Sequence, residues 1–220
     1  MYYNVHTHRR LPADGGVYSI INIDSLDAPF CLEDGELQKY SAGIHPWRAN
    51  VTNLPDTMMQ LKQIVESPRV LLVGECGLDK RCDTSFEVQQ QVLDAQIQLS
   101  EEVQKPMIIH CVKAWEEIVS LKKRHQPKQA WIIHGFRGKP QLMQQLIGAG
   151  FYLSFGRLFN EESIQQTPIG RLLLETDEND ECSIQAVYRS VANSRNIKEA
   201  DLVSYVKDTI RNVVNVCDVK

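Results

Sequence analysis

Eight short apolar runs recur along the whole chain, and they constrain the fold more than any other feature of the sequence. They span residues 2–5, 18–23, 40–44, 70–73, 107–109, 131–133, 151–155 and 172–174. Between many of these runs, apolar residues fall at helical spacing, as Leu54, Met58, Leu61 and Val65 do. Short apolar strands that alternate with helices indicate a parallel sheet covered on both faces. Eight strands close a TIM-type (β/α)8 barrel, which is the α/β fold that we predict.

Four further segments carry the helical pattern, and one connection lacks it. The helical segments are 88–103, 115–119, 142–147 and 202–213. The connection between the first two strands, residues 9–17, contains Pro12 and two glycines and is too short and too broken for a helix. We therefore expect a somewhat trimmed barrel.

The composition narrows the class of protein. With 220 residues, of which 43% are hydrophobic, the chain suits a single domain spanning residues 1–220. A net charge of -4 argues against a broad basic surface for nucleic acid, although a local basic patch is compatible with it. The six cysteines form no C-x-x-C pair, which argues against a zinc ribbon or a secreted disulfide framework. The sequence shows no apolar stretch of membrane-spanning length and no secretory pattern, so we expect a cytoplasmic protein that does not bind a membrane. We also infer no obligate protein partner.

Side chains that can bind metal stand at the tails of five apolar runs. They are His6, His8, Glu75, His110, His134 and Asp177. Because the carboxyl ends of the strands meet at one face of a barrel, we expect these six side chains to converge there. Residues i and i+2 of a strand point to the same face, so His6 and His8 project together with Cα atoms ~6.6 Å apart. The six residues together predict a metal site.

Each candidate ligand alone has an ordinary structural alternative. Strand histidines can bond nearby carbonyls, Glu75 can pair with a buried arginine, and Asp177 can cap a helix. Nitrogen and carboxylate ligands suit zinc, manganese, nickel or iron and, with enough carboxylate and water, magnesium, and the sequence does not choose among them. Two divalent ions ~3.5–4 Å apart, bridged by a carboxylate such as Glu75, would lower the pKa of a shared water and position it for hydrolysis.

Seven motifs connect this pattern to a known family. They are NVHTH at 4–8, GIHPW at 43–47, VGECGLD at 73–79, PMIIH at 106–110, HGFRG at 134–138, GFYLSFG at 150–156 and LLLETD at 172–177. In this order they resemble the TatD-like metal-dependent hydrolases of the amidohydrolase superfamily, and TIRN at 209–212 resembles that family's C-terminal helix. The resemblance covers nearly the full chain and implies a metal-dependent TIM barrel. Several members are described as deoxyribonucleases that remove nucleotides from DNA ends.

Carried over residue by residue, the resemblance divides the ligands between two ions. It implies one ion held by His6, His8, Glu75 and Asp177, and a second held by Glu75, His110 and His134. Asp177 would also accept the proton of the attacking water. Asp177 and Glu75 are therefore the predicted catalytic residues.

The chain departs from the family pattern beside the ligands. Asn4 stands where the family usually has an aspartate before H-x-H, which would weaken support for a histidine ligand. Lys80 replaces an aromatic residue, residues 111–113 replace Ser-Arg-Asp, and residues 178–180 replace a small residue and a proline. These departures concern mostly the substrate side of the site.

Substrate contacts are predicted from their positions near the ligands. The resemblance suggests that His45 contacts the substrate phosphate or leaving group, and a structural histidine beside Pro46 is the alternative. The loops expected at the same face carry Arg9, Arg10, Arg48, Lys80, Arg81, Lys113, Arg137, Lys139 and Arg157. Of these, Arg137, Lys80 and Lys113 are our predicted contacts, as a local grip on phosphate.

Four further residues near the predicted ligands have structural or binding interpretations. Trp47 and Phe136 could stack on an unpaired base or pack over the barrel rim. Cys76 and Cys111 should alternate away from the ligands into the core.

Three functions fit these observations. The favoured one is a metal-dependent phosphodiesterase of the exonuclease type, most simply a deoxyribonuclease acting on DNA ends. The second is a hydrolase of a small amide, lactone or phosphoester, motivated by the altered segment after Asp177. The third is a nonenzymatic metal-binding scaffold, motivated by Asn4 and the short chain.

Overall fold

The strands of the computed structural model, which describes residues 1–9, 16–24, 38–178 and 182–214, follow the predicted order. They are β1 (Tyr2–Thr7), β2 (Val17–Asp24), β3 (Gln38–Gly43), β4 (Val70–Asp79), β5 (Met107–Val112), β6 (Trp131–Ile133), β7 (Tyr152–Phe155) and β8 (Leu172–Leu174). They form one sheet in the order β1 to β8, and β1/β2, β3/β4, β4/β5 and β7/β8 pair in parallel. Sequential parallel strands joined through helices define a TIM-type (β/α)8 fold, so the predicted fold class is confirmed.

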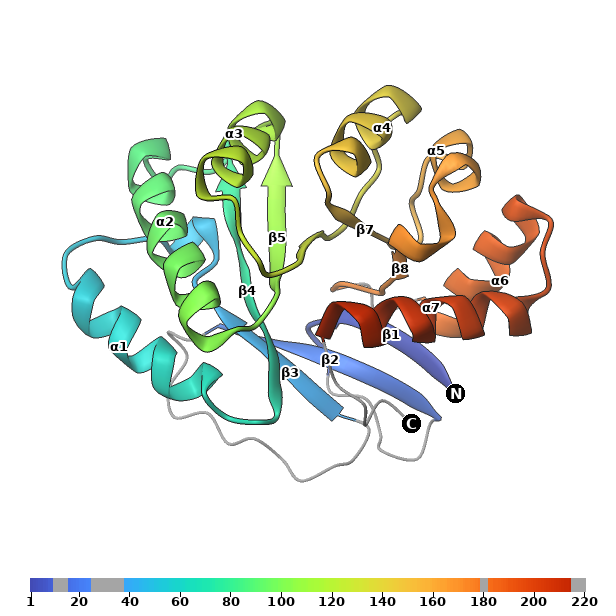
Figure 1. Cartoon of the computed structure of the whole chain (residues 1–220), viewed down its shortest axis with the longest axis horizontal. Helices are drawn as coiled ribbons and strands as arrows, with labels where there is room; N and C mark the ends of the chain where they lie inside the picture. Colours follow the sequence, from blue (N-terminus) through green and yellow to red (C-terminus); the bar gives the residue numbers. More distant parts are fainter. Residues whose placement is uncertain (10–15, 25–37, 179–181, 215–220) are drawn as a thin grey trace. The chain divides into compact units, whose positions relative to one another are not determined.

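Helices follow most of the strands. They are α1 (Leu54–Val65), α2 (Phe86–Val103), α3 (Trp115–His125), α4 (Pro140–Gly148), α5 (Glu161–Gln166), α6 (Ile184–Arg195) and α7 (Glu199–Val214), with the short 3-10 helices η1 (Pro46–Arg48) and η2 (Ile169–Arg171) (Figure 1). Both α5 and α6 were not predicted, although α6 buries Ile184, Val187, Tyr188 and Val191 at helical spacing. Among the described helices, none is both long and apolar enough to span a bilayer.

Two compact units divide the chain. The first comprises Met1–Ile21, Gly35–Lys39 and Ile133–Lys220, and the second comprises Asn22–Asp34 and Tyr40–Ile132. The single domain over 1–220 stays a prediction. The expectation of a trimmed barrel depends on the connection 9–17. Most of this connection, including Arg10, lies outside the described residues.

The first unit is organised around β1 and β8. Both strands contact α6 and α7, which lie together in Figure 1. The buried hydroxyl of Tyr188 on α6 donates to the carbonyl of Tyr3 at 3.0 Å and accepts from its amide at 3.3 Å. Beyond the strands, Thr7 and Asp177 form a further parallel bridge. The ends of β1 and β8 are therefore held side by side.

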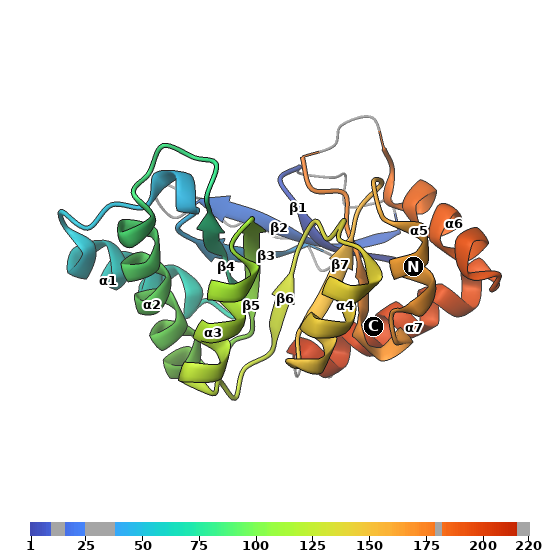
Figure 2. The ribbon, with the colours of Figure 1, turned by 90° about the horizontal axis from the view of Figure 1, so that it is seen from above.

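The second unit is organised around β4 and β5. Helix α2 packs against β4 and α3 against β5, as Figure 2 shows from above. The fully buried amide of Gln96 on α2 accepts from the backbone of Ile44 at 2.8 Å and donates to its carbonyl at 3.1 Å. Because Ile44 immediately precedes His45, these two bonds fix where the chain leaves β3 and turns into η1.

Candidate metal centre

Three of the predicted ligands meet in the first unit. His6 lies in β1, His8 directly follows it, and Asp177 follows β8. The Nε2 atoms of His6 and His8 lie 3.6 and 3.7 Å from Oδ1 of Asp177. The amide of Asp177 donates to the carbonyl of His6 at 3.1 Å, and the amide of His8 donates to the carbonyl of Asp177 at 3.3 Å. Backbone pairing between the two strand ends therefore brings the three side chains together.

These separations and donor types fit a shared divalent ion. Both distances exceed a normal hydrogen bond, whereas two ligand atoms bound to one tetrahedral ion lie about 3.4 Å apart. The side chain of His6 is fully buried, and those of His8 and Asp177 are about one third exposed. Such an arrangement leaves one side open, as a catalytic metal site requires for water or substrate.

His134 lies beside this cluster together with Glu175, a residue that the sequence analysis did not single out. The rings of His134 and His6 lie 4.5 Å apart between centroids. Nδ1 of His134 is 3.5 Å from Oε1 of Glu175, which accepts from the amide of Gly135 at 2.7 Å. Glu175 is fully buried and can share a cation with His134 and Asp177. The available signal in the sequence was its spacing of two residues from Asp177, because residues i and i+2 of an extended segment point to the same face.

Asn4 supports the segment that carries Asp177. Its Nδ2 donates to Oγ1 of Thr176 at 2.8 Å, and its Oδ1 accepts from the Thr176 amide at 3.1 Å. Both bonds are buried, and they reach Thr176, next to Asp177, where we had expected Asn4 to support a histidine ligand. The side-chain amide thus supplies one donor and one acceptor, a combination that an ionised aspartate does not have.

We expect Asn4→Leu to lower the free energy of unfolding by about 1–3 kcal/mol, because it leaves the buried polar groups of Thr176 without these partners. Urea denaturation measures the change. Asn212→Leu, on the exposed side of α7, is the matched control and should stay within about 0.5 kcal/mol of wild type. Equal stability of the two variants would contradict this role of Asn4.

The second unit holds another group of possible ligands, which consists of His45, Glu75 and His110. Oε1 of Glu75 on β4 lies 2.9 Å from Nδ1 of His110 on β5 and 3.3 Å from Nε2 of His45. Glu75 is 4% exposed, and its backbone amide donates to the side chain of Asn22 at 2.7 Å. One carboxylate oxygen thus faces two imidazoles. The predicted substrate residue His45 therefore lies among the predicted ligands of this unit.

The other side of His110 faces Asp79, which the sequence analysis also did not single out. Nε2 of His110 lies 3.3 Å from Oδ2 of Asp79. Burial by itself would raise the pKa of Asp79, but hydrogen bonds from Trp47 Nε1, the Arg81 amide and His110 outweigh it and hold this pKa below its usual value. Asp79 is therefore an anion at neutral pH. In that state it fixes the orientation of the His110 ring.

Close approach of β4 to β5 places Glu75 beside His110. An added Cβ at Gly74 would lie 2.3 Å from the carbonyl oxygen of Ile108, and one at Gly77 would lie 1.9 Å from that of His110. Both glycines also have positive φ angles, +127° and +152°. Only glycine fits these positions, so the two glycines of the GECG motif allow the two strands to approach on either side of Glu75.

The predicted basic contacts have different surroundings. Arg137 and Arg157 line a pocket of about 290 Å³ that also includes Asp177. Lys80 forms an ion pair with Glu117, and Lys113 is exposed at the end of β5. The roles of Arg137, Lys80 and Lys113 in substrate binding stay predictions. Of the altered segment 178–180, only its first residue lies within the described part of the chain.

The two aromatic candidates, Phe136 and Trp47, differ in exposure. Phe136 is 1% exposed and packs edge-on against Phe155, so its interpretation as a packing residue is confirmed, whereas Trp47 is 62% exposed. Cys76 is fully buried, as predicted, and burial raises the pKa of its thiol. Cys111, which was also expected in the core, is instead only partly buried, and this burial raises the pKa of its thiol to about 12.

The fold and these clusters define a class of protein, a (β/α)8 fold with histidine and carboxylate groups placed around the ends of its strands. The profile of TatD related DNases matches residues 33–215. The chain belongs to this family.

Two relatives illustrate the likeness in sequence. The 3'-5' ssDNA/RNA exonuclease TatD of Erwinia tasmaniensis is 33% identical over 147 residues, which are 62% of this chain and 56% of that protein. The uncharacterized metal-dependent hydrolase YjjV of Escherichia coli is 30% identical over 169 residues, which are 72% of this chain and 60% of that protein. The chain thus matches less than two thirds of the length of either relative.

Two solved structures share the fold. The crystal structure of the TatD homologue YjjV from Escherichia coli superimposes with a TM-score of 0.82 and 23% identity, covering 98% of both chains. A TatD family hydrolase from Entamoeba histolytica superimposes with a TM-score of 0.77 and 17% identity, covering 97% of both chains. At these identities the likeness establishes the fold.

Proposed function

We propose that the protein is a metal-dependent phosphodiesterase that removes nucleotides from the ends of single-stranded DNA. The cluster of His6, His8 and Asp177 is the observation that carries the proposal, because its distances and its open side suit a catalytic ion. Membership of the TatD family and the exonuclease activity in the name of the Erwinia relative support phosphodiester bonds as the substrate class.

Residues of each unit would hold metal. His6, His8 and Asp177 would hold one divalent ion, and Glu75 with His110 would hold a second. Such ions lower the pKa of water toward neutrality and offset charge on a phosphoryl oxygen. The sharing of Glu75 between both ions and the assignment of His134 to the second one stay predictions.

The chain's own groups would then carry the remaining steps. The Asp177 carboxylate accepts the proton of the attacking water, and the pairing of Asn4 with Thr176 keeps that carboxylate in place. Arg137 and Arg157, in the pocket that contains Asp177, supply donors for phosphate oxygens. His45 contacts the phosphate or the leaving group beside Glu75 and His110.

The test is the degradation of labelled single-stranded DNA by the purified protein with each of Mg, Mn, Zn, Ni and Fe(II). We expect stepwise shortening that a chelator stops and that readdition of metal restores. Replacing one metal ligand should lower the rate by at least about 100-fold, since even the loss of a residue that only orients a ligand costs 10- to 100-fold. His8→Ala is the best variant, because its side chain is about one third exposed and its removal should spare the fold.

His125→Ala is the matched control, since His125 on α3 pairs with Asp94 on α2 in a partly exposed contact away from the predicted ligands. It should retain the wild-type rate and metal content. Bound metal without any shortening of DNA would refute the proposal. Turnover of small lactones or amides by the same preparation would then favour a different hydrolase.

A further inference from the structure

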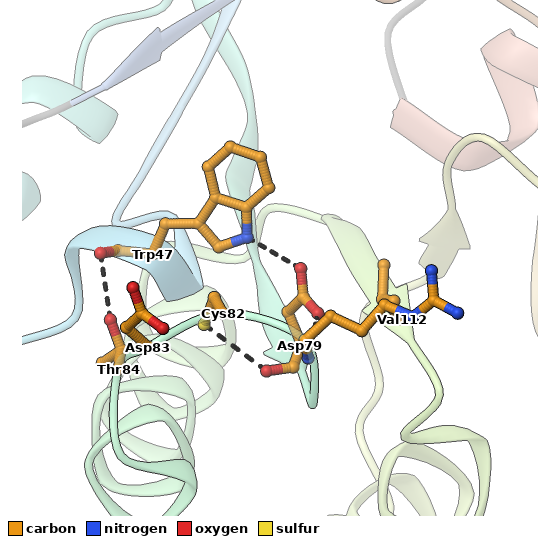
Figure 3. Close-up of a pocket in the computed structure, with 7 residues that line it drawn as sticks. Trp47, Asp79, Cys82, Asp83, Thr84 and Val112 are labelled. Atoms are coloured by element: carbon orange, nitrogen blue, oxygen red, sulfur yellow. Dashed lines mark hydrogen bonds between the residues drawn. The ribbon is translucent and has the colours of Figure 1, made fainter.

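An open groove of about 540 Å³ lies beside the ligands of the second unit. It is lined by Trp47, Asp79, Arg81, Cys82, Asp83, Thr84 and Val112 (Figure 3). Asp79 connects it to the predicted metal ligands, because the same carboxylate that faces the groove lies 3.3 Å from His110. A group that occupied the groove would lie beside the residues that would hold the ion of this unit, Glu75 and His110.

Trp47 is unusual because it is exposed and yet held in place. Its indole nitrogen donates to Oδ2 of Asp79 at 2.7 Å, and its carbonyl accepts from Oγ1 of Thr84 at 3.0 Å (Figure 3). Its amide donates to Nδ1 of His45 at 3.2 Å, and the two rings meet edge to face at 5.0 Å. Trp47 nevertheless remains 62% exposed. An aromatic surface held in advance loses little conformational entropy when a ligand stacks on it.

A buried side chain of helix α2 also fixes the wall of the groove. The side chain of Gln89 is 1% exposed, accepts from the Asp79 amide at 2.7 Å and donates to the carbonyls of Asp79 and Thr84 at 3.0 and 2.8 Å. It therefore ties both ends of the loop that contains Arg81 to helix α2. The guanidinium group of this exposed arginine adds a positive charge that suits a neighbouring phosphate.

We propose that this groove is a base subsite, in which the unpaired base next to the scissile phosphodiester stacks on the indole of Trp47. Every base has a π face, so the subsite accepts any base and disfavours a duplex end whose bases are already stacked. The inference rests on the proposed function for the nature of the substrate. Beyond that function, it identifies Trp47 as the residue that distinguishes a nucleotide from a small phosphodiester without a base.

The experiment combines two changes, one in the protein and one in the DNA. Wild type and Trp47→Ala degrade matched oligonucleotides that have either a normal or an abasic terminal nucleotide. Stacking on an aromatic side chain contributes about 1–3 kcal/mol per base, so either change alone should raise KM about 5- to 150-fold. Both changes together should cost no more than one, because each removes a partner of the same contact. An equal abasic effect in wild type and Trp47→Ala would overturn the proposal.

Two further variants separate stacking from other roles of Trp47. Trp47→Phe keeps an aromatic face but loses the hydrogen bond to Asp79, so it should retain most of the abasic effect on KM. If Trp47→Phe instead loses that effect as Trp47→Ala does, the indole acts through Asp79 and stacking is refuted. Tyr205→Ala removes another exposed aromatic ring, on α7 in the first unit, and should leave KM unchanged.

A binding measurement keeps this inference distinct from the proposed function. Short oligothymidylate should quench the tryptophan fluorescence of wild type and not that of Trp47→Phe, which retains Trp115 and Trp131. Quenching without any cleavage would support the subsite and refute the nuclease. Cleavage in which base removal has no effect on KM would support the nuclease and refute the subsite.

Discussion

Asp177→Asn is expected to lower kcat for phosphodiester hydrolysis by about 10²- to 10⁴-fold, because the variant loses the group that accepts the proton of the attacking water. The substitution should spare the fold. Asparagine keeps the shape of the side chain and leaves unchanged the backbone bonds that join residue 177 to His6 and His8. Residue 177 also has a φ angle of +54°, a conformation that asparagine tolerates well.

Measurements of metal content and turnover separate the roles of Asp177. If Asp177→Asn retains its metal but has a lower kcat, the role of this carboxylate is proton transfer. If the variant loses its metal, the role of this carboxylate is ion binding. Asp201→Asn, an exposed carboxylate in the first turn of α7, is the control and should behave as wild type. A wild-type kcat in Asp177→Asn would contradict both roles.

Gly77→Ala is expected to destabilise the protein by on the order of 3 kcal/mol, the combined cost of a strained φ angle and of overpacking. The added Cβ would lie 1.9 Å from the carbonyl oxygen of His110, at a φ angle of +152° that residues with a side chain rarely adopt. Relief of this clash would move β4 away from β5 and so separate Glu75 from His110. We expect a lower denaturation midpoint and a loss of activity greater than the loss of folded protein.

Gly148→Ala is the matched control, because it makes the same chemical change where no atom lies within 4 Å of the added Cβ. Gly148 is the last residue of α4, so alanine should be neutral or slightly stabilising there. Urea denaturation of both variants gives the comparison. Equal stability would show that the close approach of β4 and β5 at Gly77 is not required.

Much of the fold follows from local patterns in the sequence. The run at 131–133 and the run at 172–174 coincide with β6 and β8, and the helical spacing from Leu54 to Val65 coincides with α1. In contrast, β4 extends from the predicted 70–73 to Asp79. Its second half contains Gly74, Glu75 and Gly77, which interrupt the apolar pattern. The pairing with β5 extends the strand there, and that pairing involves residues some thirty positions away.

The candidate site follows the same division. Polar residues at the tails of apolar runs marked His6, His8, Asp177, Glu75 and His110, because a carboxylate or imidazole after a buried strand is already unusual by itself. Glu175 also directly follows an apolar run, but the metal role in that motif was assigned to Asp177, and Asp79 ends no apolar run. Each is one of two carboxylates within a short motif, and its neighbours in space, His134 and His110, identify it as part of the site.

The sequence by itself determined the alternation of strands and helices and the residues able to bind metal, since periodicity and side-chain chemistry are local properties. The tertiary structure decided which of these residues are neighbours, because that depends on pairing between segments far apart in the chain. Trp47 and Phe136 illustrate the difference, as they carried the same two interpretations in the sequence. Packing against Phe155 buries Phe136, whereas the hydrogen bond to Asp79 holds Trp47 at the surface with its ring exposed.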